Sequence, residues 1–358
     1  MPRNVKLRSA RGLRMPGLNV ATGLVAAAAT VGALLVASKW FLRNTSIRPK
    51  PVVIAGGQQH QAPVDGPATD APPDGGPVSQ EARQLAALYG KMADDFAAQD
   101  LNHAAIEPLK SWFHGLESPS DTPWPKKYTE LDPPLQFGAI RLLVVPLDDS
   151  PAVLRIAAAV TADVMRRLPQ GTKVFANARG NYHCTVFHTS QPTDPRPDPT
   201  RPDGGTDLSL APHLRRLPTA AEWERELEAV RRLVAETPVP VLRLERVVQA
   251  SSGVLLLTWT EVGEGAAISG LRHRLRETFP GASTKQATII HSSLLRIVSS
   301  EPLGRAAVEE VSAACQRWTE RLRGTLYRPK TLWFIRETEF STVVGDREVL
   351  TLADASAP

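Results

Sequence analysis

Residues 137–352 alternate short, β-branched apolar runs with longer amphipathic stretches, and this alternation constrains the fold more than any other feature. Runs of the first kind are typical of strands, and an apolar stripe repeating every three or four residues is typical of a helix. We expect strands at 140–145, 173–189, 241–248, 254–262, 287–298, 326–336 and 340–352, and helices at 154–168, 223–234, 268–279 and 303–322. This mixture predicts an α+β domain over residues 79–358.

Two further segments frame this pattern. Ser79, with Glu81 close behind, can begin a helix, and a second short helix is expected at 104–116, before a proline-rich connector. The polar stretch 191–218 contains the sequence PTDPRPDPTRPDGG. Its length and composition predict an exposed, mobile loop, either a lid or an insertion.

The N-terminus has a composition of its own. Residues 1–16 are basic, and residues 17–42 are apolar and almost free of charge, long enough to cross a bilayer. We expect a single-pass signal anchor there with a cytosolic N-terminus; the alternative is a presequence for a mitochondrion or plastid. Residues 43–78 are rich in proline and glycine and read as a disordered tether between membrane and domain.

The overall charge separates along the same boundary. The formal charge of the 358 residues is +5, but residues 1–64 contain nine Lys or Arg and no Asp or Glu, so the remainder carries −4. A broad electrostatic footprint for nucleic acid on the main domain is therefore excluded. Two cysteines exclude a disulfide-rich scaffold and a four-thiolate zinc site.

Two short segments within predicted strands resemble each other. Tyr-His-Cys-Thr places His183 and Thr185 two residues apart, and Ile-His-Ser-Ser does the same for His291 and Ser293. Because side chains alternate along a strand, each histidine shares a face with its hydroxyl residue. Two such strands side by side would gather two imidazoles and two hydroxyls.

That set of groups suits phosphoester chemistry. One neutral imidazole can take a proton from water or a 2′-hydroxyl while the other, protonated, gives a proton to the leaving oxygen. The hydroxyls can donate hydrogen bonds to the non-bridging phosphate oxygens as charge develops there. We expect no metal and no cofactor in this scheme.

The pair of H-x-T and H-x-S motifs resembles the 2H phosphoesterase superfamily, in particular its RNA ligase/cyclic nucleotide phosphodiesterase-like group. The resemblance covers residues 137–337 and implies two pseudo-symmetric βα lobes with antiparallel sheets around a central cleft. It assigns catalysis to His183 and His291, and phosphate binding to Thr185 and Ser293. The chain departs from simpler members in the separation of 108 positions between its histidines and in the polar residues Cys184 and Ser292 at the middle positions, where an apolar residue is typical.

The resemblance implies a metal-independent phosphodiesterase acting on cyclic phosphates of nucleotides or RNA ends. The alternative is a catalytically idle, membrane-anchored module that binds nucleotides or RNA ends. The partners expected are therefore a nucleotide cyclic phosphate or RNA terminus and, through residues 17–42, a membrane. We expect the catalytic domain to be monomeric.

Five other residues need an interpretation. Arg179 and Lys285 share strand parity with His183 and His291, so each either makes a secondary phosphate contact or remains solvated. His188 has the opposite parity to His183 and is expected at a strand end, away from the site. Cys184 and Cys315 are expected as small core residues rather than nucleophiles.

Overall fold

The structure is a computed structural model and describes residues 79–263 and 266–353. The basic segment, the anchor and the tether expected in residues 1–78 lie outside the described residues. Within those residues, no helix combines the length and the apolar character needed to cross a bilayer.

The described chain is a mixed α+β fold. Its α-helices are α2 Gln80–Gln99, α3 His103–Ile106, α4 Pro151–Met165, α5 Ala220–Ala235, α6 Ala267–Thr278 and α7 Arg305–Leu322. Its strands are β1 Phe113–His114, β2 Trp124–Pro125, β3 Arg141–Pro146, β4 Val174–Ala176, β5 His183–Ser190, β6 Leu242–Gln249, β7 Val254–Glu261, β8 Ile290–Ile297, β9 Leu326–Tyr327, β10 Thr331–Glu337 and β11 Gly345–Thr351. Short 3-10 turns occupy Glu107–Trp112, Tyr128–Glu130, Arg179–Asn181 and Pro212–Leu214.

Local sequence accounts for where the helices begin. The Ser79 side chain accepts a hydrogen bond from the Ala82 amide, which confirms the predicted start of α2. Thr219 and Glu222 form a reciprocal capping box at the start of α5.

Three predicted segments are divided differently from the expectation; one is the strand expected at 326–336, which is β9 followed by β10. The single strand expected at 173–189 is two strands, β4 and β5, which are separated by the 3-10 turn Arg179–Asn181. The helix expected at 104–116 is the single turn α3, followed by the 3-10 turn Glu107–Trp112 and by β1. A proline at the start of that turn, Pro108, removes an amide donor that a longer α-helix would use.

One large antiparallel sheet runs in the order β11-β10-β3-β5-β8-β7-β6-β9, with β4 paired to β8. Where the resemblance implied two separate sheets, the structure joins both halves at the β5–β8 seam. That seam consists of one register pair, Cys184 with Ser292. Beyond it the Arg272 guanidinium of α6 donates hydrogen bonds to carbonyl oxygens of both sides, Thr185 and Val186 at 3.0 and 3.1 Å and Ile289 at 2.9 Å.

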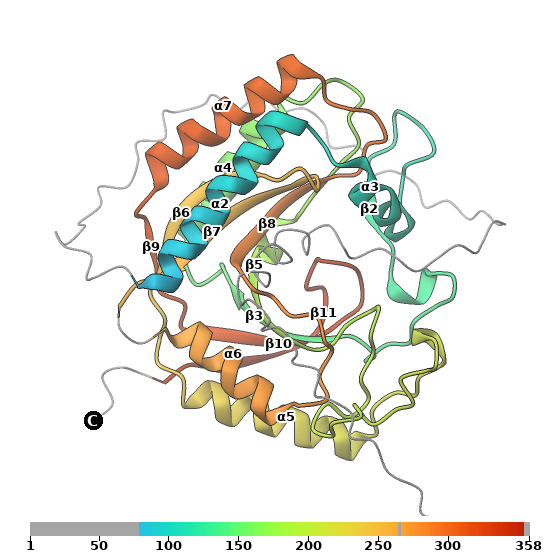
Figure 1. Ribbon diagram of the computed structural model, residues 1–358. Helices are drawn as coiled ribbons and strands as arrows, with labels where there is room; N and C mark the ends of the chain where they lie inside the picture. Colours follow the sequence, from blue (N-terminus) through green and yellow to red (C-terminus); the bar gives the residue numbers. More distant parts are fainter. Residues whose placement is uncertain (1–78, 264–265, 354–358) are drawn as a thin grey trace, which may run out of the picture.

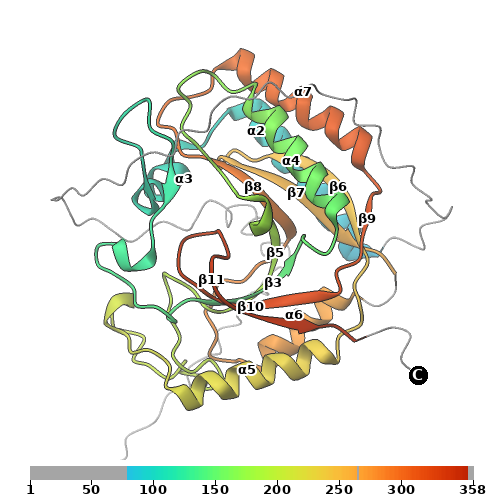
Figure 2. The same ribbon diagram turned by 180° about the vertical axis from the view of Figure 1, so that it is seen from behind.

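Helices cover one face of this sheet on both sides of the seam. Figures 1 and 2 show α4 and α7 over the half that contains β6, β7 and β8, and α5 and α6 over the half that contains β3, β10 and β11. The main hydrophobic cluster lies between these helices and the sheet; it includes Val160, Val230, Leu257, Trp259 and Phe334, each fully buried. We call this side the core face.

The opposite side of the sheet is covered near its end by α2. Tyr89 of α2 packs with Val248, Val254 and Leu256 of the β6–β7 hairpin, and its hydroxyl donates a hydrogen bond to the Trp259 carbonyl at 2.9 Å. Along β7, Val254 and Leu256 alternate with Leu255 and Leu257 of the main cluster. Helix α2 therefore packs beside the central strands on the face opposite the core face.

The first part of the loop 191–218 is held against the domain, because residues 195–199 are buried, whereas most of residues 201–211 are exposed as expected. Arg196 and Asp198 are 5 % and 3 % exposed. Arg141 of β3, itself fully buried, donates a hydrogen bond from Nη2 to the Arg196 carbonyl at 2.6 Å, and its Nε contacts both Glu226 carboxylate oxygens at 2.9 and 3.0 Å. The buried ion pair of Arg141 and Glu226 thus holds this first part of the loop through the Arg196 carbonyl.

Candidate functional site

The register at the seam brings the two predicted motifs together. Because Cys184 faces Ser292 in an antiparallel pair, continuing that register places His183 opposite Ser293 and Thr185 opposite His291. Residues opposite each other in such a pair lie on one side of the sheet, with Cβ atoms about 5 Å apart. The four predicted residues therefore share one face, which we call the motif face.

The middle residues of the motifs point to the core face. The Cys184 sulfur and the Ser292 hydroxyl lie 3.0 Å apart, and Ser292 accepts a hydrogen bond from the Trp259 indole at 3.3 Å. Both middle residues are buried, and burial raises the pKa of the Cys184 thiol to about 12. The two polar middle residues are thus hydrogen-bonded to each other across the seam. Cys184 and Cys315 are both buried core residues, as expected.

A β-bulge changes the position of His188. Along β5, Thr185 pairs with Val144 and Phe187 pairs with Leu143, so Val186 is an extra residue and the alternation resets. His188 pairs with Leu142, which lies on the same side of β3 as Val144, the partner of Thr185. His188 therefore lies on the motif face, which corrects the prediction that its parity turns it away.

The second strand carries a matching bulge. On β8, Ser293 pairs with Leu256 and Leu295 with Leu255, so Leu294 is extra and Arg296 returns to the motif face. Both strands thus present a third side chain five residues after the histidine, His188 on β5 and Arg296 on β8. Parity counting missed both; the equal spacing in HCTVFH and HSSLLR is the signal that could have found them.

His183 is held in one tautomer. Its Nδ1–H donates a hydrogen bond to the Asn181 carbonyl oxygen at 2.7 Å, from the 3-10 turn before β5. The neutral ring then carries its lone pair on Nε2. The residue is 7 % exposed, and burial lowers its pKa below the usual histidine range, opposed in part by the Asn181 hydrogen bond.

The pKa of His291 departs further from the usual histidine value than that of His183 does. Burial, followed by the charge of His183 and of two arginines, lowers its pKa to about 3. Its Nδ1 is buried and has no hydrogen-bond partner among the described residues. Both motif imidazoles are therefore neutral near pH 7 when no anion lies between them.

The two predicted secondary contacts differ from each other. Arg179 lies in a 3-10 turn and is exposed, so the strand parity that suggested a phosphate contact does not apply to it. Lys285 lies in the segment before β8, and its ammonium is buried without a hydrogen-bond partner among the described residues. Burial lowers its pKa, and its charge helps to lower the pKa of His188, whose backbone is bonded by the side chain of the next residue, Gln286.

Arg296 contributes a further cation to the motif face. Its guanidinium lies 5.3 Å from the centre of the Phe340 ring, and burial lowers its pKa to about 10, so it stays charged at pH 7. Its charge is one of those that lower the pKa of His291. In the described ranges 79–263 and 266–353, no three His, Cys, Asp or Glu side chains are grouped as metal ligands would be.

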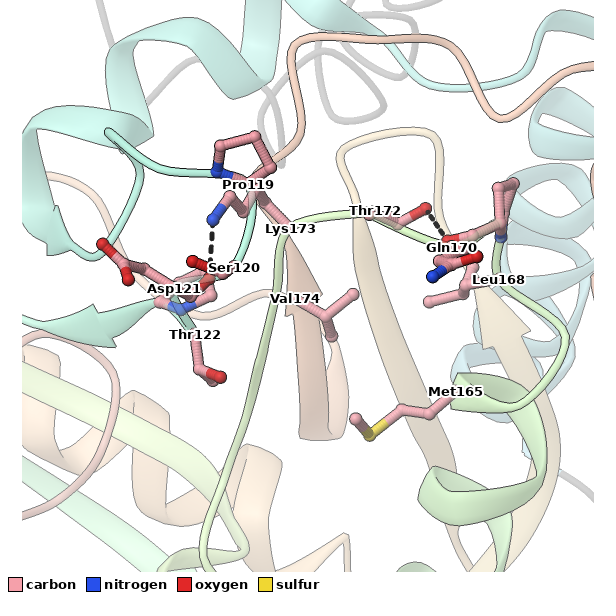
Figure 3. A pocket seen from close by; sticks show the side chains of 13 residues that line it. Pro119, Ser120, Asp121, Thr122, Met165, Leu168, Gln170, Thr172, Lys173 and Val174 are labelled. Atoms are coloured by element: carbon pink, nitrogen blue, oxygen red, sulfur yellow. Dashed lines mark hydrogen bonds between the residues drawn. The ribbon is translucent and has the colours of Figure 1, made fainter. Parts of the chain in front are cut away.

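A pocket of about 360 Å³ lies elsewhere, between residues 119–123 and the end of α4 (Figure 3). Its one lysine, Lys173, donates hydrogen bonds to the carbonyl oxygens of Gly115, Ser118 and Asp121. None of the four motif residues lines it. With its cation already satisfied by backbone oxygens, this pocket offers less to an anion than the motif face.

Comparison with known proteins gives little beyond the geometry. No protein-family model matches the chain, and no curated protein matches it significantly. Among solved structures, the conserved protein of unknown function ATU0111 from Agrobacterium tumefaciens is 13 % identical, with a TM-score of 0.41 over 64 % of this chain and 94 % of its own. Usb1 from Kluyveromyces marxianus is 11 % identical, with a TM-score of 0.36 over 60 % and 99 % of the two chains.

A second structure of Usb1, with uridine monophosphate, gives 13 % identity and a TM-score of 0.35 over the same shares of the chains. Scores this low support no conclusion about this chain. The functional argument rests on its own residues.

Proposed function

We propose that this chain is a phosphodiesterase that opens cyclic phosphates on nucleotides or RNA ends by acid–base catalysis between two histidines. The observation that supports it is the β5–β8 register, in which each motif histidine lies opposite the hydroxyl residue of the other motif. A phosphate above this seam would meet an imidazole and a hydroxyl from each strand. The match of both motifs to the 2H phosphoesterase pattern agrees with this chemistry.

We infer the role of each ring from the hydrogen bond of His183. Neutral His183 carries its lone pair on Nε2, so it is the base that removes a proton from water as the water oxygen attacks phosphorus. His291, as imidazolium, gives its proton to the 2′- or 3′-oxygen as the bond from that oxygen to phosphorus breaks. Thr185 and Ser293 donate hydrogen bonds to the non-bridging oxygens. Proton loss from His183 and proton gain by His291 complete the cycle.

The low pKa of His291 fits this scheme once substrate is present. An anionic phosphate beside the ring favours the charged imidazolium and raises its pKa. A proton held on a ring of low intrinsic pKa is readily given to a leaving alkoxide. Binding of the anionic substrate therefore promotes protonation of His291, the general acid.

The test is hydrolysis of a panel of nucleoside 2′,3′-cyclic phosphates and linear phosphodiesters, followed by chromatography of the monophosphate products. His183→Gln and His291→Gln should each lower kcat by about 10²–10⁴-fold, the usual contribution of a general acid or base. His273→Gln is the matched control, because that ring lies on α6 with 75 % of its side chain exposed. It should keep the wild-type rate.

A chelator should leave the rate unchanged. Wild-type rates in both histidine variants, or a strict requirement for an added divalent ion, would contradict the proposal. Tight binding of the same nucleotides without turnover would instead favour the idle binding module.

A further inference from the structure

His188 and Lys285 form a basic pair at one end of the motif face, and neither residue has a part in the two-histidine scheme. The Gln286 side chain brings them together, since its amide donates to the His188 carbonyl at 2.8 Å and its oxygen accepts from the His188 amide at 2.9 Å. This clamp replaces a strand partner where β5 and β8 have separated. It fixes the segment containing Lys285 against the bulged end of β5.

Both members of the pair lack partners. The Lys285 ammonium and the His188 Nδ1 are buried, and neither has a hydrogen-bond partner among the described residues. No carboxylate is among the groups that shift the pKa of either one; burial, His183 and Lys285 lower the pKa of His188, and burial lowers that of Lys285. Asp194, which accepts a hydrogen bond from the Thr284 amide next to Lys285 at 3.1 Å, is already engaged by Arg196 and Arg215 at 2.8–2.9 Å.

An unpaired buried cation is costly, and proteins rarely keep one without a ligand or a function. Two basic groups at the same end of the motif face, whose nitrogen atoms have no hydrogen-bond partner among the described residues, are complementary to an anion with several oxygens. A phosphate group has that form. The pair therefore has the chemistry of an anion site that is separate from the seam itself.

The position along β5 fits a second phosphate of the same ligand. His188 lies four residues after Cys184, of which one is the extra residue of the bulge, so it is three strand positions, about 10 Å, from the seam pair. Thr185 and His291 lie between the two points. A ligand with its reacting phosphate at the seam could reach the pair only by extending along β5.

We propose that His188 and Lys285 bind a second phosphate of the substrate, so that the preferred substrate is an oligonucleotide end rather than a mononucleotide. This inference rests on the proposed function for the identity of the reacting phosphate. Lys285 supplies the charge and His188 a hydrogen bond, and the bulge at Val186 is what positions the latter. Neither residue touches the reacting atoms, so both are specificity residues.

The kinetic test compares a trinucleotide ending in a 2′,3′-cyclic phosphate with the corresponding nucleoside 2′,3′-cyclic phosphate. The wild type should prefer the trinucleotide in kcat/KM. Lys285→Met keeps the length of the side chain and removes the charge, and it should lower that preference about tenfold or more, as expected for one charge-assisted hydrogen bond. Lys285→Arg should restore most of it, and Lys91→Met, an exposed lysine of α2, should not change it.

Thermal unfolding separates this role from a structural one. Removal of an unpaired buried cation should leave Tm equal or higher in Lys285→Met, while the preference for the trinucleotide falls. A preference that stays at the wild-type value, or that falls only together with Tm, would overturn the proposal.

Calorimetry keeps the inference separate from the proposed function. A trinucleotide with a terminal 3′-phosphate should bind the wild type more tightly than a nucleoside 3′-monophosphate, and Lys285→Met should remove most of that difference. If this holds while no substrate is hydrolysed, the phosphodiesterase activity fails and the second phosphate site stands. Equal affinity of the wild type for both ligands would refute the site, whatever the activity.

Discussion

His183 and His291 are chemically identical side chains that the structure places in different hydrogen-bonding states. One has its Nδ1 fixed on the Asn181 carbonyl, and the other has a buried Nδ1 with no hydrogen-bond partner among the described residues. Both have pKa values below the ordinary histidine value, and that of His291 is about 3. The two-histidine mechanism needs one protonated ring, so the pH dependence should reveal when that proton arrives.

We predict different acid limbs for the two kinetic parameters. The profile of kcat/KM reports the free enzyme and should keep rising down to a pH below the usual histidine range, because both rings are neutral there. The profile of kcat reports the complex, in which the phosphate raises the pKa of the protonated ring, so its limbs should lie at higher pH. Stopped assays between pH 3 and 9 measure both, and the values belong to the pair of rings.

Coincident profiles with both limbs between about pH 5 and 8, the expectation for unperturbed histidines, would show that burial does not control these groups. The low pKa values of the two rings also predict how the stability of the fold depends on pH. Because the folded state holds these rings at low pKa, the unfolded chain binds more protons below about pH 6.5, and stability should fall as the pH decreases from there.

For single residues, the sequence predicts well which face of the sheet the motif residues share, and it predicts poorly the face of residues further along the strand. His183 and Thr185 are two residues apart, so strand alternation alone puts them on one face. His188 is five residues from His183, and one inserted residue reverses the result. The bulge depends on how β5 pairs with β3, a long-range contact that local patterns do not encode.

At the scale of elements, one buried ion pair fastens three segments together. Arg141 of β3 contacts Glu226 of α5, the Arg196 carbonyl of the loop 191–218, and the Gly138 carbonyl at 2.8 Å. Both side chains of the pair are fully buried. Proline and charge content predicted exposure for the whole loop, and the structure buries residues 195–199 because a distant arginine binds their backbone, which composition cannot show.

Glu226→Gln should therefore destabilise the domain by about 3–5 kcal/mol, because it leaves the Arg141 charge buried and unpaired. Urea unfolding followed by tryptophan fluorescence measures the effect. Asp203→Asn is the matched control: its partner Arg201, in the same loop, is exposed, and the pair should not move the midpoint measurably. An unchanged midpoint for Glu226→Gln would mean that the pair adds nothing to the fold.

At the scale of the molecule, the two halves of the sheet depend on a narrow junction. Four strands on the β5 side and five on the β8 side, β4 included, meet through one residue pair, and Arg272 supplies hydrogen bonds where β5 and β8 separate. The sequence predicted most strands and helices of both halves. It could not predict that they form one continuous sheet, since that depends on pairing residues 108 positions apart.

The start of α2 at Ser79 gives a prediction about truncated chains. Helix α2 has its own N-terminal cap there, and its Tyr89 and Phe96 are buried in the described domain. A chain of residues 79–358 should therefore fold cooperatively and remain in solution, whereas a chain starting at residue 101 would expose Val248, Val254 and Leu256 and should be far less stable. Thermal unfolding of the two truncated chains is the measurement.

The full chain should differ from residues 79–358 in its behaviour toward membranes. A stretch of about 20 apolar residues in 17–42 would resist extraction by high salt and by alkaline carbonate, because its burial in lipid does not depend on charge. The truncated chain, lacking that stretch, should be found in the supernatant of the same carbonate extraction. If the mature protein instead begins between residues 40 and 80 and fractionates as a soluble protein of an organelle, the segment is a presequence and the anchor is refuted.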